Sequence, residues 1–360
     1  MRVLTAVAVL CCVAWFVLVA DIYRLDLDVY RIGMQTWLAG GDLYGELPDT
    51  AIGVSLPFIY PPIAAVMMTP LAVVSFPVAS IALTVLTVAL VVVTLSIVLD
   101  SLGLSRRWLA LVPLAFVAEP VWSTLDYGQI NVILMALVVA DCLVPKPRWP
   151  RGVLVGLAAA VKLTPAAFVL FFLLRRDNRA ALTAAGAFLA ATVLGFLVAP
   201  KESIGFWTNE VLHTGEKVGV DFVANQSIMG VLTRMDGAQL WPLFAAMVVV
   251  LAVIGMRGEP ALALAVNSLA MLLVSPISWS HHWVWCVLIV PAFAMNGMRL
   301  LAVTGAALFV IAPHWWAWEE AWTVNAYAVY AVIALAATAV KNLRTTSLDP
   351  APGRYALRRA

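Results

Sequence analysis

The chain consists of apolar runs of membrane-spanning length separated by short clusters of charge. Charged residues make up only 12% of its 360 residues and hydrophobic residues 63%, against about 25% and about 45–50% in soluble proteins. Apolar runs in lipid must be helical, because the bilayer offers no hydrogen-bond partner to an open backbone. The pattern predicts an all-α polytopic membrane protein and excludes a cytosolic enzyme.

Several runs are shorter than the roughly 20 residues of a full crossing. We expect about 10–12 transmembrane or re-entrant helices. The first run, Val3 to Ala20, is expected to stay as a helix, because Leu18, Val19 and Ala20 make a poor signal-cleavage site. The runs lie at 3–20, 59–75, 77–99, 108–121, 130–144, 151–174, 180–199, 239–255, 260–275, 281–295, 299–312 and 323–340.

Two of these segments are interrupted. Pro70 and Pro77 break the long stretch that begins at Tyr60, so its first part should be a short or re-entrant helix. The stretch from Gly152 to Leu174 begins and ends beside basic residues and contains Lys162 in its middle. We expect a broken hairpin there, surrounded by protein or by a watery cavity.

The basic residues predict the orientation of the chain. Most of the 22 Lys and Arg lie in short loops and at the C-terminal end, which places those parts in the cytoplasm. The polar segments 21–58 and 200–238 should then be extracytoplasmic loops. This gives a multi-pass protein of the plasma membrane with both termini cytoplasmic, one integral membrane domain over 1–345 and a short cytoplasmic tail over 346–360. A net charge of +2 with dispersed bases excludes nucleic acid as a partner.

The segment after the first run carries three carboxylates, Asp21, Asp26 and Asp28. A carboxylate at the outer mouth of a helix can meet a lipid-linked substrate and can take a proton from an incoming hydroxyl as a general base. Asp26 and Asp28 are two residues apart and point to different sides of either a strand or a helix. One of them is expected to be functional, and the alternative is a solvated loop with a capping Asp.

Lys162 is the one basic residue inside an apolar run. An intramembrane charge needs an anionic partner, which is either a lipid phosphate or a carboxylate such as Asp126. His281 and His282 either link helices by polar contacts or bind phosphate and exchange protons near neutral pH. A zinc site is disfavoured, because no further His or Cys stands at ligand spacing.

The polar pieces together resemble a known family. They are similar to the polyprenyl-phosphate-sugar-dependent glycosyltransferases of the GT-C type, specifically the actinobacterial membrane family of phosphatidylinositol-mannoside and lipomannan α-(1→2)-mannosyltransferases. The similarity runs in order over about two thirds of the chain. It is carried by the segments Asp26 to Tyr30, Leu38 to Tyr44, Pro57 to Pro62, Gly128 to Asn131, Val161 to Pro165, Asn225 to Ser227 and Ser275 to His282.

The resemblance implies a GT-C-like helical bundle with an extracytoplasmic site. That site would move mannose, with inversion, from polyprenyl-phosphate-mannose to a glycolipid acceptor such as a phosphatidylinositol mannoside or lipomannan. The leaving group would be the lipid phosphate, so neither a metal nor a cofactor beyond the lipid-linked substrate is implied. By match to the family, Asp26 is the general base with Asp28 as the fallback. The implied contacts to donor phosphate or sugar are His281, Lys162, Arg234, Asn225, Gln129 and Tyr60.

Other functions stay open at this point. An arabinofuranosyltransferase that uses decaprenyl-phosphate-arabinose would share the mechanism. A secondary transporter would also have broken helices and a mid-membrane Lys, although internal repeats are expected there and none is visible in this sequence. A structural subunit of a cell-envelope assembly would tolerate the loss of Asp26.

Overall fold

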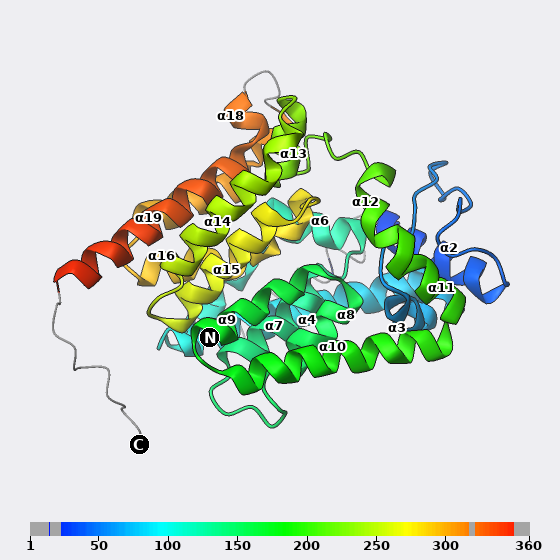
Figure 1. Ribbon diagram of the computed structural model, residues 1–360, viewed down its shortest axis with the longest axis horizontal. Coiled ribbons are helices and arrows are strands. Elements are labelled where there is room, and N and C mark those ends of the chain that lie inside the picture. The colour runs from blue at the N-terminus through cyan, green and yellow to red at the C-terminus, as the bar shows by residue number, and fades with distance from the viewer. Residues whose placement is uncertain (1–13, 15–22, 317–320, 349–360) are drawn as a thin grey trace.

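The protein is described by a computed structural model that covers residues 23–316 and 321–348, together with Ala14. Apart from one antiparallel bridge between Asn225 and Trp279, its regular elements are helical (Figure 1), which confirms the all-α prediction. The expected helix Val3 to Ala20 and tail residues 349–360 lie outside the described residues. The helices are α2 (Leu25–Leu38), α3 (Pro62–Val73), α4 (Phe76–Ser101), η2 (Arg106–Leu111), α5 (Val112–Ala115), α6 (Glu119–Tyr127), α7 (Asn131–Leu143), α8 (Val153–Val161), η3 (Thr164–Phe168), α9 (Val169–Leu174), α10 (Asn178–Val198), α11 (Pro200–Gly205), η4 (Phe206–Glu210), α12 (Val211–Lys217), α13 (Ile228–Arg234), η5 (Ala238–Leu240), α14 (Trp241–Gly255), α15 (Pro260–Val274), η6 (Ser280–Trp285), α16 (Cys286–Met295), α17 (Arg299–Ile311), η7 (Pro313–Trp315), α18 (Ala321–Val324) and α19 (Ala326–Leu348).

Fewer helices span a membrane by length than we expected. In the described part of the chain, four helices are long and apolar enough, and a pair bent by 66° over Arg106–Ala115 and Glu119–Tyr127 would make a fifth. Other apolar segments form helices of only 10–17 residues. Prolines and polar residues divide these segments, and α15 is buried along nearly its whole length. The expected 10–12 segments therefore include short helices as well as helices of full crossing length.

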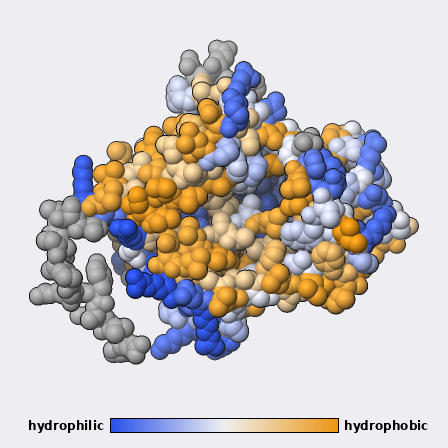
Figure 2. Space-filling model, in the orientation of Figure 1, coloured by the Kyte–Doolittle hydropathy of each residue, from blue (hydrophilic) through white to orange (hydrophobic). Residues whose placement is uncertain are grey.

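The outer surface suits a lipid environment. Figure 2 shows broad apolar areas between bands of hydrophilic residues. On α10, the side chains of Leu182 and Leu197 are 74% and 76% exposed, and Leu243 on α14 is similarly open. Large aliphatic side chains left open on long apolar helices are stable only against hydrocarbon. The chain is therefore a multi-pass membrane protein.

The stretch from Gly152 to Leu174 is the broken hairpin that the sequence predicts. Helix α8 ends at Val161, the backbone is extended at Lys162, and the chain returns through η3 and α9. A Cβ on Gly156 would overlap the carbonyl oxygen of Ala184, so α8 packs against α10 backbone to backbone. Gly152 meets the first turn of α10 in the same way. Both ends of the hairpin therefore lie beside the start of α10.

The two segments predicted as extracytoplasmic loops contain helices, which the sequence analysis did not predict. Segment 21–58 holds α2, and segment 200–238 holds α11, α12 and α13. Leu27, Tyr30 and Met34 of α2 recur at helical spacing and are buried, so one face of this polar segment packs on the core. The charged residues of segment 21–58 made this amphipathic pattern hard to recognise in the sequence. Asp26 and Asp28 accordingly stand on a helix and not on an extended loop.

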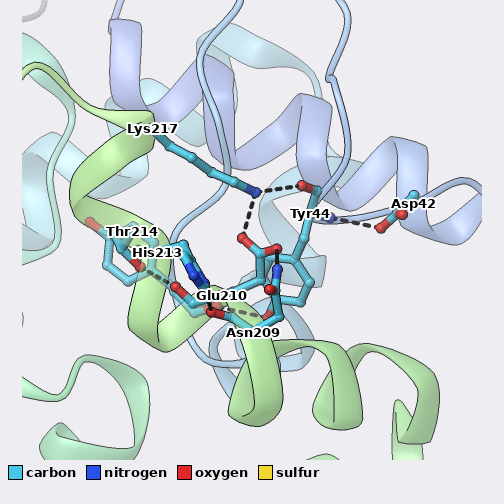
Figure 3. A network of polar contacts seen from close by, with 8 residues as sticks. Asp42, Tyr44, Asn209, Glu210, His213, Thr214 and Lys217 are labelled. Carbon is cyan, nitrogen blue, oxygen red and sulfur yellow. Dashed lines mark hydrogen bonds and ion pairs between the residues drawn. The ribbon is translucent and has the colours of Figure 1, made fainter.

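A polar contact between Lys217 and Tyr44 joins segment 200–238 to segment 21–58. Lys217, the last residue of α12, donates from Nζ to the carbonyl oxygen of Tyr44 at 3.0 Å and to the carboxylate of Glu210 (Figure 3). The hydroxyl of Tyr44 donates to the carbonyl of Tyr60 at 2.9 Å. These contacts fix the path of the chain between α2 and α3 and thereby place Tyr60.

Candidate active site

The first turn of α2 presents Asp26 to side chains from two other segments. Its position at the helix N-terminus favours a carboxylate, because unpaired backbone N–H groups lie there. The half-buried side chain hydrogen-bonds that of Gln129. Lys162 is close enough for its positive charge to favour the ionised carboxyl. Segments far apart in the sequence therefore meet at this one carboxylate.

The carboxamide of Gln129 is held by two tyrosines. The Tyr30 hydroxyl donates to Gln129 Oε1 at 2.8 Å, and the Tyr60 hydroxyl lies 3.2 Å from the same atom. The two hydroxyl oxygens are 2.9 Å apart, and all three side chains are buried. Since Oε1 faces the tyrosines, Nε2 is left to donate to Asp26.

Gly128 allows the close approach of Gln129 to α2. Its φ of +69° lies in the left-handed region, which favours glycine. A Cβ at this position would lie 2.7 Å from Arg24 Cβ and 2.9 Å from Leu27 Cβ. A larger residue would therefore push α6 away from α2 exactly where Asp26 and Gln129 meet.

Lys162 points from the break of the hairpin toward the same region. Its Nζ lies 3.2 Å from Asn131 Oδ1, 3.0 Å from His282 Nε2 and 5.5 Å from the centre of the Tyr60 ring. Among the residues that the structure describes, no carboxylate is within 4.0 Å of it. Asp126, one of its two anticipated partners, lies beside Arg24 instead, at 3.7 Å. A half-buried cation whose hydrogen-bond partners are neutral is a place for an anionic ligand.

The backbone before His282 is fixed by α6 and α7. Thr124 Oγ1 donates to the carbonyl oxygen of His281 at 2.7 Å, and Asn131 Nδ2 donates to it at 3.0 Å. Ser280 Oγ donates to the buried Glu119 at 2.7 Å. The backbone at Ser280 and His281 is thereby held against α6 and α7.

The His281 ring packs against Tyr127 and His282, with centroid separations of 5.0 and 4.8 Å. The residue is 8% exposed, and its Nε2 has no hydrogen-bond partner in the described part of the chain. Buried polar atoms are nearly always paired. This nitrogen is therefore a candidate for contact with a ligand.

A pocket opens beside Lys162 between α7, α15, η3 and η6. Its polar lining is Asn131, Lys162, Thr164, Ser278 and His282, and its apolar lining is Leu134, Pro165, Met271, Leu272 and Trp285. Polar groups gathered at an apolar pocket are typical of sites that orient a ligand. A molecule with an anionic group and a hydrocarbon part would fit this lining.

Asp28 is occupied elsewhere. Its Oδ2 accepts from the Tyr23 hydroxyl at 3.1 Å and from the backbone N–H of Ala51 at 2.9 Å. It therefore holds the chain that follows α2, whereas Asp26 faces Gln129 and Lys162.

The structure does not bring Arg234 and Asn225 to this group. The guanidinium of Arg234 donates to the side chain of Asn325 and to the carbonyls of Asp221, Phe222 and Asn225. The amide of Asn225 joins its own loop to the carbonyl of Pro276 and the N–H of Ser278. Arg234 therefore ties segment 221–234 to itself and to Asn325, whereas Asn225 ties it to Pro276 and Ser278. The donors of both residues have protein partners.

Sequence reasoning considered His282 beside His281 as a phosphate-binding or proton-exchanging residue, but it selected neither His282 nor Tyr30 nor Asn131 for the site. Tyr30 could have been found once α2 was recognised as a helix, because it follows Asp26 by four residues and shares its face. Asn131 and His282 stand next to residues that were selected. Their hydrogen bonds to Lys162 depend on how distant helices pack, which the sequence does not display.

Burial raises the pKa of the Asp26 carboxyl to about 6, while Gln129 and Lys162 act in the opposite direction. Taking a carboxylate out of water disfavours its charged form, and a hydrogen-bond donor or a cation restores it. A carboxyl with such a pKa is largely ionised at neutral pH and accepts a proton more readily than an ordinary Asp. The geometry thus combines a base, a cation and a nearby pocket.

Comparison with known proteins gives the class to which this site belongs. The profile of glycosyltransferase family 87 matches residues 58–276. A polyprenol-phosphate-mannose-dependent alpha-(1-2)-phosphatidylinositol mannoside mannosyltransferase of Mycobacterium tuberculosis is 38% identical over 315 residues, which are 80% of this chain and 74% of the relative. The chain is a member of glycosyltransferase family 87, and the resemblance drawn from its motifs is confirmed.

Two further similarities were found. A polyprenol-phosphate-mannose-dependent alpha-(1-2)-phosphatidylinositol pentamannoside mannosyltransferase of Mycolicibacterium smegmatis is 33% identical over 321 residues, covering 83% of this chain and 78% of the relative. The crystal structure of ArnT from Cupriavidus metallidurans, bound to undecaprenyl phosphate, aligns over 96% of this chain and 78% of that one, with 16% identity and a TM-score of 0.43.

Proposed function

We propose that this glycosyltransferase moves mannose from polyprenyl-phosphate-mannose to a phosphatidylinositol mannoside or related glycolipid, forming an α-(1→2) linkage. The observation that carries the proposal is that Asp26 lies near Lys162, a half-buried cation whose hydrogen-bond partners are neutral groups. A lipid-linked sugar phosphate needs both a base for the acceptor and a positive group for the phosphate. The names of the relatives supply the sugar and the acceptor class.

In the proposed reaction, Asp26 removes the proton from the acceptor hydroxyl as that oxygen bonds to C1 of mannose. The bond between C1 and the phosphate oxygen breaks at the same time, and its electron pair leaves with polyprenyl phosphate. Attack from the face opposite the leaving group turns a β-linked donor into an α-mannoside. Lys162 and His281 Nε2 stabilise the charge that gathers on the phosphate.

We further propose that the bundle is GT-C-like and forms one domain over residues 1–345. Asp26 and the pocket then face the extracytoplasmic side, with both termini in the cytoplasm. The distribution of Lys and Arg supports this orientation. The apolar part of the pocket lining would receive the first part of the polyprenyl chain.

Transfer from defined donors tests the proposal. Membranes that contain the protein are supplied separately with polyprenyl-phosphate-mannose and decaprenyl-phosphate-arabinose, each with a phosphatidylinositol mannoside extract. We expect labelled mannose in the glycolipid fraction. Arabinose incorporation would change the sugar and keep the mechanism, whereas no transfer by folded protein from either donor would refute the enzyme assignment to this donor class.

The pH dependence of transfer should follow Asp26. The base works only when ionised, and its pKa is raised to about 6, so activity should fall as the pH drops through 6. About nine tenths of the carboxyl is ionised at pH 7 and about one tenth at pH 5, which predicts a roughly ninefold difference in kcat/KM. A rate that stays level down to pH 4.5 would show that another group is the base.

A further inference from the structure

We infer that Tyr30 and Tyr60 fix the orientation of the Gln129 carboxamide, and that this orientation makes Gln129 a donor to the ionised Asp26. The inference deepens the proposed function, on which it rests, by adding residues that position the base without touching the reacting atoms. The three residues form one buried group, with Tyr30 on α2, Tyr60 just before α3 and Gln129 just after α6.

The available protons decide which way the amide faces. Each tyrosine hydroxyl has one proton to donate, and Gln129 Oε1 lies within reach of both hydroxyls, at 2.8 and 3.2 Å. An ionised Asp26 has no proton and must receive one. With Oε1 toward the tyrosines and Nε2 toward Asp26, the hydroxyl protons and the carboxylate all find partners.

The reversed amide would serve an ionised Asp26 badly. Its oxygen would then face the carboxylate, and two acceptors would be in contact with no proton between them. That arrangement fits only a protonated Asp26. The tyrosine pair therefore acts against the protonated state by stabilising the amide orientation that suits the anion.

Other groups also act on Asp26 and must be separated from the amide. Lys162 from the hairpin break favours the anion directly, and the hydroxyls of Tyr60 and Tyr127 also face it. Arg24 with Asp126 and Asp28 stand near the same helix end, and the His281 ring stacks on Tyr127. Changing the tyrosines also removes the Tyr30 and Tyr60 hydroxyls that interact with Asp26 directly, while the other groups stay in place. A comparison of the tyrosine changes with and without Gln129 separates that direct effect from the effect that passes through the amide.

The test is the pH dependence of kcat/KM for transfer by the full chain, measured from pH 4.5 to 8 with polyprenyl-phosphate-mannose. Removal of both hydroxyls in Tyr30→Phe/Tyr60→Phe frees the amide, so the acidic midpoint should rise by about 0.5–1 pH unit. Gln129→Leu should raise the midpoint as well. The triple variant should match Gln129→Leu alone, because the tyrosines act through the amide.

Tyr330→Phe is the matched control, because its buried hydroxyl donates to the Leu301 carbonyl and not to Gln129; its midpoint should stay at the wild-type value. If the double variant does not fold, Tyr30→Phe and Tyr60→Phe alone should each give a smaller rise. An unshifted midpoint in these variants, or a shift in the triple variant that adds to that of Gln129→Leu, would overturn the inference. If the wild type transfers mannose and the midpoints of the variants are unshifted, only this inference is refuted. If the wild type transfers no mannose, the proposed function is refuted as well.

Discussion

Asp26→Asn is expected to lower the rate of mannose transfer by about 100-fold to 10,000-fold, the usual contribution of a positioned general base. Asn keeps the shape of the side chain and can still contact Gln129, but it cannot take the proton from the acceptor. Donor affinity and thermal stability in detergent should stay close to the wild-type values. The measurement is initial transfer rate at saturating donor, beside equilibrium binding of the donor lipid.

Asp28→Asn is the matched control, since it removes the same charge two residues away. Its carboxylate holds Tyr23 and the N–H of Ala51, and loss of such hydrogen bonds should keep activity within about tenfold of the wild type. Full activity of Asp26→Asn together with an inactive Asp28→Asn would reverse the assignment. Two active variants would contradict the enzyme mechanism altogether.

Lys162→Met is expected to reduce kcat by about 100-fold to 1,000-fold, the range found when one charge-stabilising group is lost from a transition state. The developing phosphate charge would then have no nearby cation within the pocket lining. Folding should be preserved or improved, because a half-buried charge with neutral partners is replaced by an apolar side chain of similar length. Transfer rates and melting temperatures in detergent together check this.

Lys201→Met controls for loss of a positive charge as such, because Lys201 is exposed on α11. It should transfer mannose at the wild-type rate. If Lys162→Met kept the wild-type kcat, the phosphate role of Lys162 would be refuted, and its contacts with Asn131 and His282 would be structural.

The helical architecture and the broken hairpin could be predicted because their causes are local. A continuous apolar run in lipid must form a helix. The polar residues around Lys162 interrupt their apolar run, whichever helices that run packs against. The helical state of segments 21–58 and 200–238 was missed because charged residues on the exposed face masked the buried stripe of Leu27, Tyr30 and Met34. The length of an apolar run in the sequence also did not show which segments cross the membrane, since several runs form helices of only 10–17 residues.

The structure brings some of the predicted site residues together and not others, for a physical reason. Asp26, Gln129, Tyr60, Lys162 and His281 fall into one neighbourhood, whereas Arg234 and Asn225 join loops. The residue type shows that a side chain can bind an anion. The tertiary contacts decide whether its hydrogen-bond donors are free to do so. Arg234 uses its donors on Asn325 and on backbone carbonyls, and only the folded structure displays those partners.

The most direct measurement is the anomeric configuration and linkage of the product. Purified protein in lipid vesicles is given β-linked polyprenyl-phosphate-mannose labelled with ¹³C at C1 and a defined phosphatidylinositol mannoside, and the new sugar is examined by NMR. We expect a single α-(1→2)-linked mannose, formed by the wild type and Asp28→Asn and not by Asp26→Asn. A β-linked product, or α-linked product formed equally by Asp26→Asn, would contradict transfer by inversion with Asp26 as the base.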